Sequence, residues 1–171
     1  VENWSPIEFF AGNYDGQGHS INNLRVYKAV EEKSDDYIFR SGFVAKNAGT
    51  IKNLTIKNAI MHCEVDEDYK MTSTAMLGGI AGWNEGIIDY CTVENSTIYL
   101  KFSDQDNDRK LYGYCAGLVG RLADKAKIRY STVKNCDIDI HTPTKTNAGD
   151  TNYANASAIV AKCTGSVEYC L

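Results

Sequence analysis

Residues 79–95, GIAGWNEGIIDYCTVEN, decide the fold because the chain repeats this stretch. Related copies stand at 42–58 (GFVAKNAGTIKNLTIKN) and 117–135 (GLVGRLADKAKIRYSTVKN), a partial copy begins at 158, and Ile21, Leu24 and Val26 resemble a degenerate first copy. The copies that begin at 42, 79, 117 and 158 are 37, 38 and 41 residues apart. A repeat of this length is typical of a solenoid in which each copy builds one turn.

The segments between the repeated Gly and Asn residues alternate in polarity, as strands do. After Asn58, for example, Met61, Cys63 and Val65 alternate with polar residues. The pattern predicts three short strands per repeat: one at the Gly-rich motif, one across the Ile-to-Val stretch and one after the Asn. We therefore expect an all-β, right-handed parallel β-helix of about four to five turns, with residues 1–171 forming one domain.

If successive turns stack directly, equal offsets in the repeat become neighbours about 4.8 Å apart. An aliphatic column then lies inside, Asn and Tyr columns lie at corners, and outward columns alternate in charge, which stabilises neighbouring strands. The aliphatic column is Ile51, Ile88, Ile128 and Val167. The corner columns are Asn58, Asn95 and Asn135, and Tyr90, Tyr130 and Tyr169 with Asn53 below them. The charged outward columns are Lys52, Asp89, Arg129 and Glu168, and Lys57, Glu94 and Lys134.

The bulk composition narrows the function classes. The 171 residues are 43% apolar and 23% charged, with a net charge of −4. Nucleic-acid binding requires a basic surface, so this balance argues against it. No apolar run is long enough to span a bilayer, and we expect no membrane insertion in this segment.

The six cysteines lack the spacing of a metal site, since no pair forms Cys-x-x-Cys. Cys91 and Cys170 occupy the repeat position of Leu54 and Ser131, where cysteine acts as a small apolar residue. Free, buried thiols are the favoured interpretation. One or more disulfides are the main alternative, and a metal site is the least favoured.

Each repeat contains more residues than a turn requires. The surplus precedes the next Gly motif, at 31–36, 64–70, 104–110 and 142–152. We expect these excursions to emerge at one edge of the coil, where insertions often mark a binding face. Tyr37, Tyr112 and Tyr153 share one offset, five residues before the motif.

The Gly-Leu-Val-Gly form at 117–120 and the Ile-x-x-Cys-x-Val-x-Asn form at 88–95 resemble the GLUG repeat of bacterial surface proteins. Residues 10–24, FAGNYDGQGHSINNL, resemble the lead-in to such repeats, so residues 1–20 are expected to form a lead-in or cap, with repeats from about 21, 42, 79, 117 and 158. The resemblance implies a right-handed parallel β-helix in secreted or surface-anchored proteins, including haemagglutinin-like adhesins and stalk regions of immunoglobulin proteases. It implies no catalytic residues.

Asp104, Asp106 and Asp108 have the alternating spacing of a calcium loop. However, Arg109 stands where the turn glycine belongs, and no glutamate follows at the twelfth position. A solvated acidic loop is therefore the favoured interpretation. Ca²⁺ is the one cofactor that the sequence leaves open.

For the aromatic residues near the excursions, carbohydrate binding is a better functional hypothesis than catalysis. The candidate ligand-binding residues are Tyr37, Tyr69, Trp83, Tyr112 and Tyr153. The competing interpretation, which the sequence favours, is that these rings pack against the edge and corners of the coil and stabilise it.

An enzyme must also be considered, because parallel β-helices include polysaccharide lyases and hydrolases. Glycoside hydrolysis needs two carboxylates with different pKa values. Here the outward carboxylates of the strands, Asp89, Glu94 and Glu168, are each expected beside a basic residue of an adjacent turn. The pattern therefore argues against catalysis.

The sequence thus predicts a non-catalytic structural or adhesive module of a bacterial surface or secreted protein, located outside the cell. Its expected partners are a host glycan or an extracellular protein, together with further domains of the same polypeptide. We expect the segment to be part of a longer chain, because an open end of a coil exposes unpaired backbone. A polysaccharide-acting β-helix enzyme is the alternative.

Overall fold

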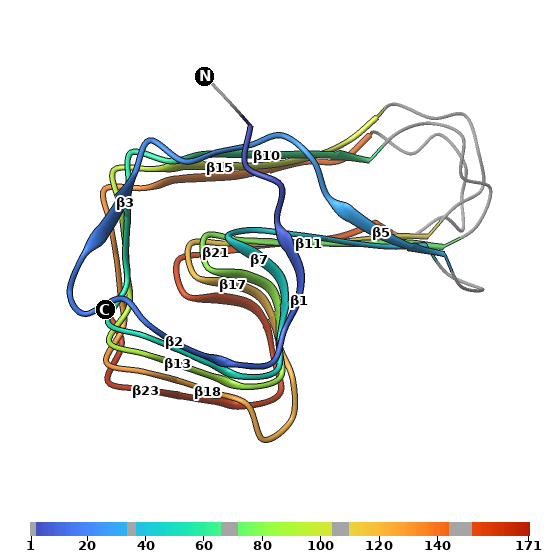
Figure 1. Cartoon of the computed structure of the whole chain (residues 1–171). Coiled ribbons are helices and arrows are strands. Elements are labelled where there is room, and N and C mark those ends of the chain that lie inside the picture. Colours follow the sequence, from blue (N-terminus) through green and yellow to red (C-terminus); the bar gives the residue numbers. More distant parts are fainter. Residues whose placement is uncertain (1–2, 34–36, 66–71, 104–109, 144–151) are drawn as a thin grey trace.

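The computed structural model describes residues 3–33, 37–65, 72–103, 110–143 and 152–171. Across these residues the chain forms a parallel β-solenoid of about four turns (Figure 1). The described residues form no helix, and hence none long and apolar enough to cross a membrane. The expectation of an all-β parallel solenoid is confirmed.

Five sheets run along the coil, and we name each sheet after its strand in the turn that begins at Ser73. The β11 sheet contains β5 (Val30–Lys33), β6 (Tyr37–Ser41), β11 (Ser73–Gly78), β16 (Leu111–Ala116) and β21 (Asn152–Ser157). The β12 sheet contains β1 (Ile7–Phe10), β7 (Val44–Asn47), β12 (Ala81–Asn84), β17 (Val119–Leu122) and β22 (Val160–Cys163). The β13 sheet contains β2 (Asn13–Asp15), β8 (Thr50–Lys52), β13 (Ile87–Asp89), β18 (Lys127–Arg129) and β23 (Ser166–Glu168).

The two remaining sheets have four strands each. The β14 sheet contains β3 (Ser20–Asn22), β9 (Thr55–Lys57), β14 (Thr92–Glu94) and β19 (Thr132–Lys134). The β15 sheet contains β4 (Arg25–Val26), β10 (Ile60–Val65), β15 (Thr97–Phe102) and β20 (Asp137–His141).

The prediction of three strands per turn is therefore wrong: a full turn has five. The Ile-to-Asn stretch divides into two strands because a residue in the left-handed region, such as Tyr90 at φ 50°, turns the chain between β13 and β14. A further strand, β11, lies before the Gly-rich motif, and a U-turn at the start of the motif separates it from β12 (Figure 1).

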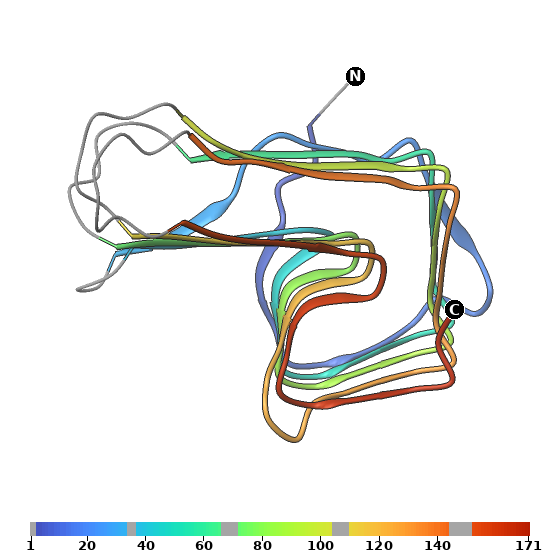
Figure 2. The same cartoon turned by 180° about the vertical axis from the view of Figure 1, so that it is seen from behind.

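The aliphatic column lies inside the coil in the predicted register. Ile88 pairs with Ile51 on one side and Ile128 on the other, and Ile128 pairs with Val167. The three isoleucines are fully buried, whereas Val167 lies on the terminal strand and is 41% exposed. Successive turns lie over one another from behind as well (Figure 2).

The corner columns are confirmed too. Asn58, Asn95 and Asn135 adopt φ values of 51–52°, the left-handed conformation that Asn tolerates best among residues with a side chain. Tyr90, Tyr130 and Tyr169 adopt the same conformation at the preceding corner, as does Asn53. Their rings form a ladder, with centroids 4.7 Å apart for the first pair and 5.0 Å for the second.

The first turn differs from its predicted register. Tyr14, rather than Ile21, pairs with Ile51, and Ile21 pairs with Ile56. The lead-in residues therefore already contribute β1, β2 and β3 to the sheets. Part of the first excursion also forms a strand, β5, which pairs antiparallel with β6 at the N-terminal edge of the β11 sheet.

The U-turn explains why the first residue of the motif is a glycine. A Cβ at Gly79 would lie 2.9 Å from the Val93 side chain, so the U-turn reaches across the interior to the β14 sheet. The strand pairs that flank the excursions end and begin in register, with Val65 opposite Phe102 and Ser73 opposite Leu111. The strands that flank the excursions therefore end and begin at one edge of the coil (Figure 2).

All six cysteines are free. Cys63, Cys91 and Cys115 are buried inside the coil, and burial raises the pKa of each thiol, to about 12 for Cys63 and Cys115 and about 11 for Cys91. Cys91 and Ser131 occupy one inward column, because the Ser131 hydroxyl accepts the Cys91 amide at 3.1 Å.

Candidate binding site on the concave face

Two sheets meet at a re-entrant angle on the outside of the coil. The strands of the β11 sheet run into the U-turn, and those of the β12 sheet leave it below them (Figure 1). The outer faces of the two sheets are therefore turned towards each other, and side chains meet across the angle, Arg40 with Trp83 and Lys162 with Tyr114. We call the surface that these two outer faces form the concave face. It comprises Arg40, Tyr112, Tyr114 and Tyr153 from the β11 sheet and Lys46, Trp83, Arg121 and Lys162 from the β12 sheet.

The alternation of β16 shows which of its residues face outward. A Cβ at Gly113 would lie 2.9 Å from the Phe102 ring in the β15 sheet, so position 113 faces the interior. Successive side chains of a strand point to opposite faces, so Tyr112 and Tyr114 point out. A pocket of about 310 Å³ lies at the N-terminal end of this face, lined in part by Phe9, Arg40 and Lys46.

Small residues allow the two sheets to approach closely. A Cβ at Gly82 would lie 2.7 Å from the Met76 carbonyl oxygen and 2.8 Å from the Ser41 amide nitrogen. Gly120 has the same relation to Leu77 and Tyr114. The last small residue of each motif therefore packs against backbone of the β11 sheet. This packing holds the re-entrant angle.

A column of cations and one tryptophan runs along the β12 side of the concave face. Trp83 pairs in register with Lys46 on one side and Arg121 on the other, and Arg121 pairs with Lys162. The Arg40 and Arg121 guanidinium carbons each lie 4.7 Å from the Trp83 ring centroid, and the Lys46 Nζ lies 4.8 Å from it. These distances are those of cation–π contacts.

The tyrosines occupy the opposite side of the angle. The Lys162 Nζ donates a hydrogen bond to the Tyr114 hydroxyl at 3.2 Å and lies 5.0 Å from the ring centroid. Tyr112 and Tyr153 stack with their centroids 5.1 Å apart and their planes almost parallel. Because stacking covers one face of each ring, the pair offers mainly ring edges and hydroxyl groups.

The charges differ along the concave face. At the N-terminal end, Glu32 pairs with Arg40, and the Glu85 carboxylate lies 3.1 Å from the Lys46 Nζ. Towards the C-terminal end, Arg121 and Lys162 form no ion pair with any described carboxylate. Two like charges therefore stand directly opposite each other on adjacent strands, an arrangement that is destabilising.

Three nitrogen donors of this face are buried without an acceptor among the described residues. They are the Arg40 Nε, the Trp83 Nε1 and the Arg121 Nε. Buried donors are nearly always paired, so each exception calls for a reason. Here all three belong to the cluster around one indole ring.

The structure brings three of the predicted ligand-binding residues onto the concave face: Trp83, Tyr112 and Tyr153. Tyr69 lies outside the described residues, as do Asp104, Asp106 and Asp108, so the proposed calcium loop is not described. The exposed fraction of Tyr153 is 50%, whereas Tyr112 and Trp83 are partly buried.

Tyr37 does not align with Tyr112 and Tyr153. It pairs with Ser73, which pairs with Leu111, whereas Tyr112 pairs with Tyr153. The first copy has one residue fewer before its Gly motif, since Ser41 pairs with Leu77 rather than with Gly78. A one-residue shift moves a side chain to the other face of its strand.

Five residues of the concave face were missed from the sequence: Arg40, Lys46, Tyr114, Arg121 and Lys162. A signal for three of them exists, because Lys46, Arg121 and Lys162 each lie four residues after the start of a Gly motif, at the offset of Trp83. Arg40 and Tyr114 belong to the strand before the motif, where one residue is missing in the first copy.

Two carboxylates of the β13 and β14 sheets, Glu94 and Asp89, are engaged in ion pairs. Glu94 lies 2.6 Å from the Lys134 Nζ and 2.7 Å from the Lys57 Nζ, and the hydrogen bond from Lys134, then that from Lys57, lowers its pKa. Asp89 accepts from Arg129 at 2.8 Å. A carboxyl group with a lowered pKa stays ionised at neutral pH and is a poor general acid.

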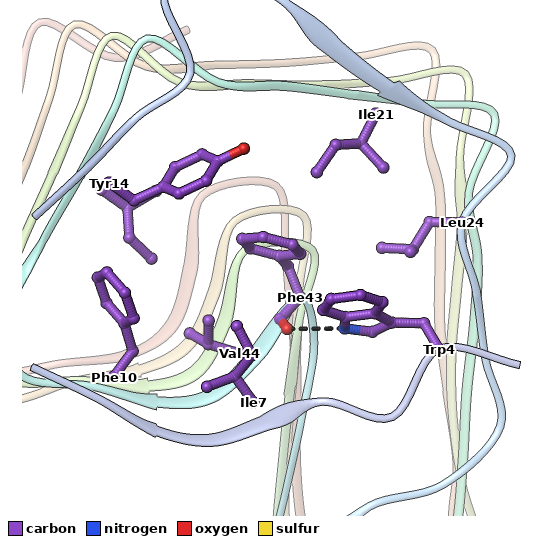
Figure 3. A pocket seen from close by; sticks show the side chains of 9 residues that line it. Trp4, Ile7, Phe10, Tyr14, Ile21, Leu24, Phe43 and Val44 are labelled. Carbon is purple, nitrogen blue, oxygen red and sulfur yellow. Dashed lines mark hydrogen bonds between the residues drawn. The ribbon is translucent and has the colours of Figure 1, made fainter. Parts of the chain in front are cut away.

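The N-terminal end of the coil contains an apolar pocket of about 430 Å³ (Figure 3). Trp4 crosses this end, stacks on Phe43 with a centroid distance of 5.5 Å and donates its indole N–H to the Phe43 carbonyl oxygen at 2.9 Å. The other lining residues include Phe10, Tyr14 and Ile51. The pocket is the end of the interior and provides no cluster of polar groups for chemistry.

Comparisons with known proteins agree with this architecture. Residues 73–99 match the family model of the GLUG motif. A crystal structure from Bacteroides ovatus, of a protein provisionally assigned as an immunoglobulin A1 protease, is similar over 99% of this chain, with 14% sequence identity and a TM-score of 0.50. This chain covers 64% of that structure, and the low identity shows a likeness of fold alone.

No curated protein matches the chain. The matched residues 73–99 contain β11 to β14 and the U-turn between β11 and β12, which are the elements that recur in each turn. The chain therefore carries the GLUG motif in a parallel β-solenoid, consistent with the GLUG-repeat β-helix family.

Proposed function

We propose that the chain is a non-catalytic binding module of a bacterial surface or secreted protein, which contacts an extracellular glycan through its concave face. The observation that supports this function most directly is the cluster of Arg40, Trp83 and Arg121, whose buried donors have no described acceptor. Glycans present many hydroxyl and carboxyl oxygens, which can accept hydrogen bonds from such donors.

The geometry favours hydrogen bonding over stacking of sugar rings on aromatic faces. Cations lie against the Trp83 ring, and the Tyr112 and Tyr153 rings cover one face of each other. The edges, hydroxyl groups and nitrogen donors remain for a ligand. A coil of stacked turns repeats such groups along its axis, as a polymeric ligand repeats its own.

Glycan-array binding of the purified chain tests this function, together with an assay for released sugar products. We expect binding without product release, and Trp83→Leu should weaken binding. Tyr130→Leu, which removes an aromatic ring from the opposite wall, is the matched control. Binding to no glycan would contradict the proposal, and product release abolished by Asp89→Asn would support the enzyme alternative.

A further inference from the structure

We propose that the ligand of the concave face is an acidic polysaccharide, whose carboxylate or sulfate groups bind between Arg121 and Lys162. This inference rests on the proposed function and specifies the ligand class. It is carried by a contrast within the molecule: the outward charge columns alternate in sign on two sheets, and on the concave face they do not.

The β13 and β14 sheets show the alternating arrangement. The Lys52 Nζ lies 3.3 Å from the Asp15 carboxylate, and the Asp89 carboxylate in the next turn lies 2.8 Å from Arg129. Lys57 and Lys134 lie on either side of Glu94. Opposite charges thus stabilise neighbouring turns on these two walls.

The corresponding column of the β12 sheet has no anion. It reads Phe9, Lys46, Trp83, Arg121 and Lys162 in register. Glu85 compensates Lys46 from a neighbouring position, but no described carboxylate pairs with Arg121 or Lys162. An anionic group placed between these two side chains would remove their repulsion and form charge-assisted hydrogen bonds with both.

Neighbouring groups fit the same ligand. The Tyr114 hydroxyl already accepts from the Lys162 Nζ, so it holds this ammonium group at the angle between the sheets. The unpaired Nε of Arg121 and Nε1 of Trp83 provide two further donors within the same cluster. Both donors are buried, so an oxyanion reaches them only when the side chains around the indole ring move aside.

A polysaccharide fits this face better than an acidic protein does. The core of a protein interface is mostly apolar and depleted of lysine, although arginine, tyrosine and tryptophan are enriched there. On the described part of the concave face, by contrast, cations and hydrogen-bond donors occupy the centre, and Phe9 and Tyr153, both at least half exposed, lie towards its two ends.

Binding of four polymers by isothermal calorimetry tests this inference: polygalacturonate, heparin, neutral dextran and poly-glutamate, each at 50 and 500 mM NaCl. We expect one or both acidic polysaccharides to bind at low salt and to lose affinity at high salt, since salt screens exposed charges. The double variant R121Q/K162Q should lower that affinity at least about tenfold, the factor that one lost charge-assisted hydrogen bond supplies.

The control is K127Q/K52Q, which removes two cations from the β13 sheet and should retain affinity within about twofold. Circular dichroism of both variants checks that the coil is intact. If neither acidic polysaccharide binds, or if R121Q/K162Q binds as the wild type does, the inference is wrong. Tighter binding of poly-glutamate than of both acidic polysaccharides would instead identify an acidic protein as the ligand.

The glycan array distinguishes a failure of this inference from a failure of the proposed function. Binding of neutral glycans alone would overturn the acidic ligand and leave the binding module standing. An array with no binding would overturn both.

Discussion

The two walls formed by the β13 and β14 sheets and the concave face are built by the same stacking, but they use charge differently. On the walls, the columns that run through Lys52 and through Lys57 contain carboxylates that lie between or beside the cations, as Glu94 does between Lys57 and Lys134. On the concave face, Arg121 and Lys162 are neighbours of one sign. Where the column alternates, charge holds the turns together. Where the column does not alternate, other contacts hold the turns together, and the positive charge remains available to bind a ligand.

The largest effect is expected from a change that opens the concave face itself. In Gly82→Val the new side chain would meet backbone atoms of the β11 sheet at less than 3 Å, and backbone cannot move aside as a side chain can. We expect a loss of about 3 kcal/mol of unfolding free energy, at the upper end of the range for overpacking. Denaturant titration measures it.

Gly12→Ala is the matched control for this change. A Cβ there would lie 3.5 Å from the Phe10 ring, which is ordinary contact. Equal losses in the two variants would show that the close approach of the sheets is not what Gly82 provides.

The next effect comes from converting a wall into the arrangement of the concave face. Glu94→Gln leaves Lys57 and Lys134 facing a neutral residue, so the melting temperature should fall at pH 7. The folded-state pKa of Glu94 is lowered from 4.5, so its contribution is present above pH 4.5 and is lost as pH falls through the folded value. The melting curves of variant and wild type should therefore converge in acid. A constant difference from pH 7 to pH 3 would contradict this account.

A smaller effect is expected from relieving the like charges. Lys162→Gln removes the repulsion on Arg121, and salt screens the same repulsion in the wild type. The wild type should therefore gain more stability from added NaCl than the variant does, by about 0.5 kcal/mol, as for one cross-strand charge pair. Thermal unfolding in 20 mM and 500 mM NaCl measures the difference. An identical salt response would show that Arg121 and Lys162 do not repel each other.

The smallest effect is expected inside the coil, behind both regions. Cys91→Ser places a hydroxyl where Ser131 has one in the next turn, and the Ser131 hydroxyl donates to the Arg129 carbonyl at 2.8 Å. The Cys91 thiol already faces the equivalent carbonyl of Asp89 at 3.4 Å. The stability should change by less than about 0.5 kcal/mol, since one short hydrogen bond offsets the lost apolar burial. Cys63→Ser is the comparison, because its buried thiol has no such carbonyl partner among the described residues. It should lose more.

Much of the coil could be predicted because stacking converts equal sequence offsets into neighbours. The Ile51, Ile88 and Ile128 column and the Tyr90, Tyr130 and Tyr169 ladder follow directly from that rule. The number of strands could not be predicted in the same way. It depends on how sharply the backbone turns at each corner, and a tyrosine such as Tyr90 does not by itself indicate the left-handed conformation that separates β13 from β14.

The candidate site was predicted only in part for a related reason. The sequence identified Trp83 as a candidate aromatic residue but did not reveal the column to which it belongs. The residues at the equivalent positions of the other turns differ in type. Tyr37 was aligned by counting back from Gly42, and one residue missing before that glycine moved it to the opposite face. A column of identical residues reveals its register, whereas a column of mixed residues needs the coordinates.

The antiparallel strand β5 has a consequence for assembly. It occupies the N-terminal edge of the β11 sheet with the opposite chain direction, so the parallel ladder of this sheet ends at β6. A further strand at that edge, if it ran in the direction of the turns, would have to pair antiparallel with β5. A second coil therefore cannot continue this sheet as an uninterrupted parallel ladder from its N-terminal edge.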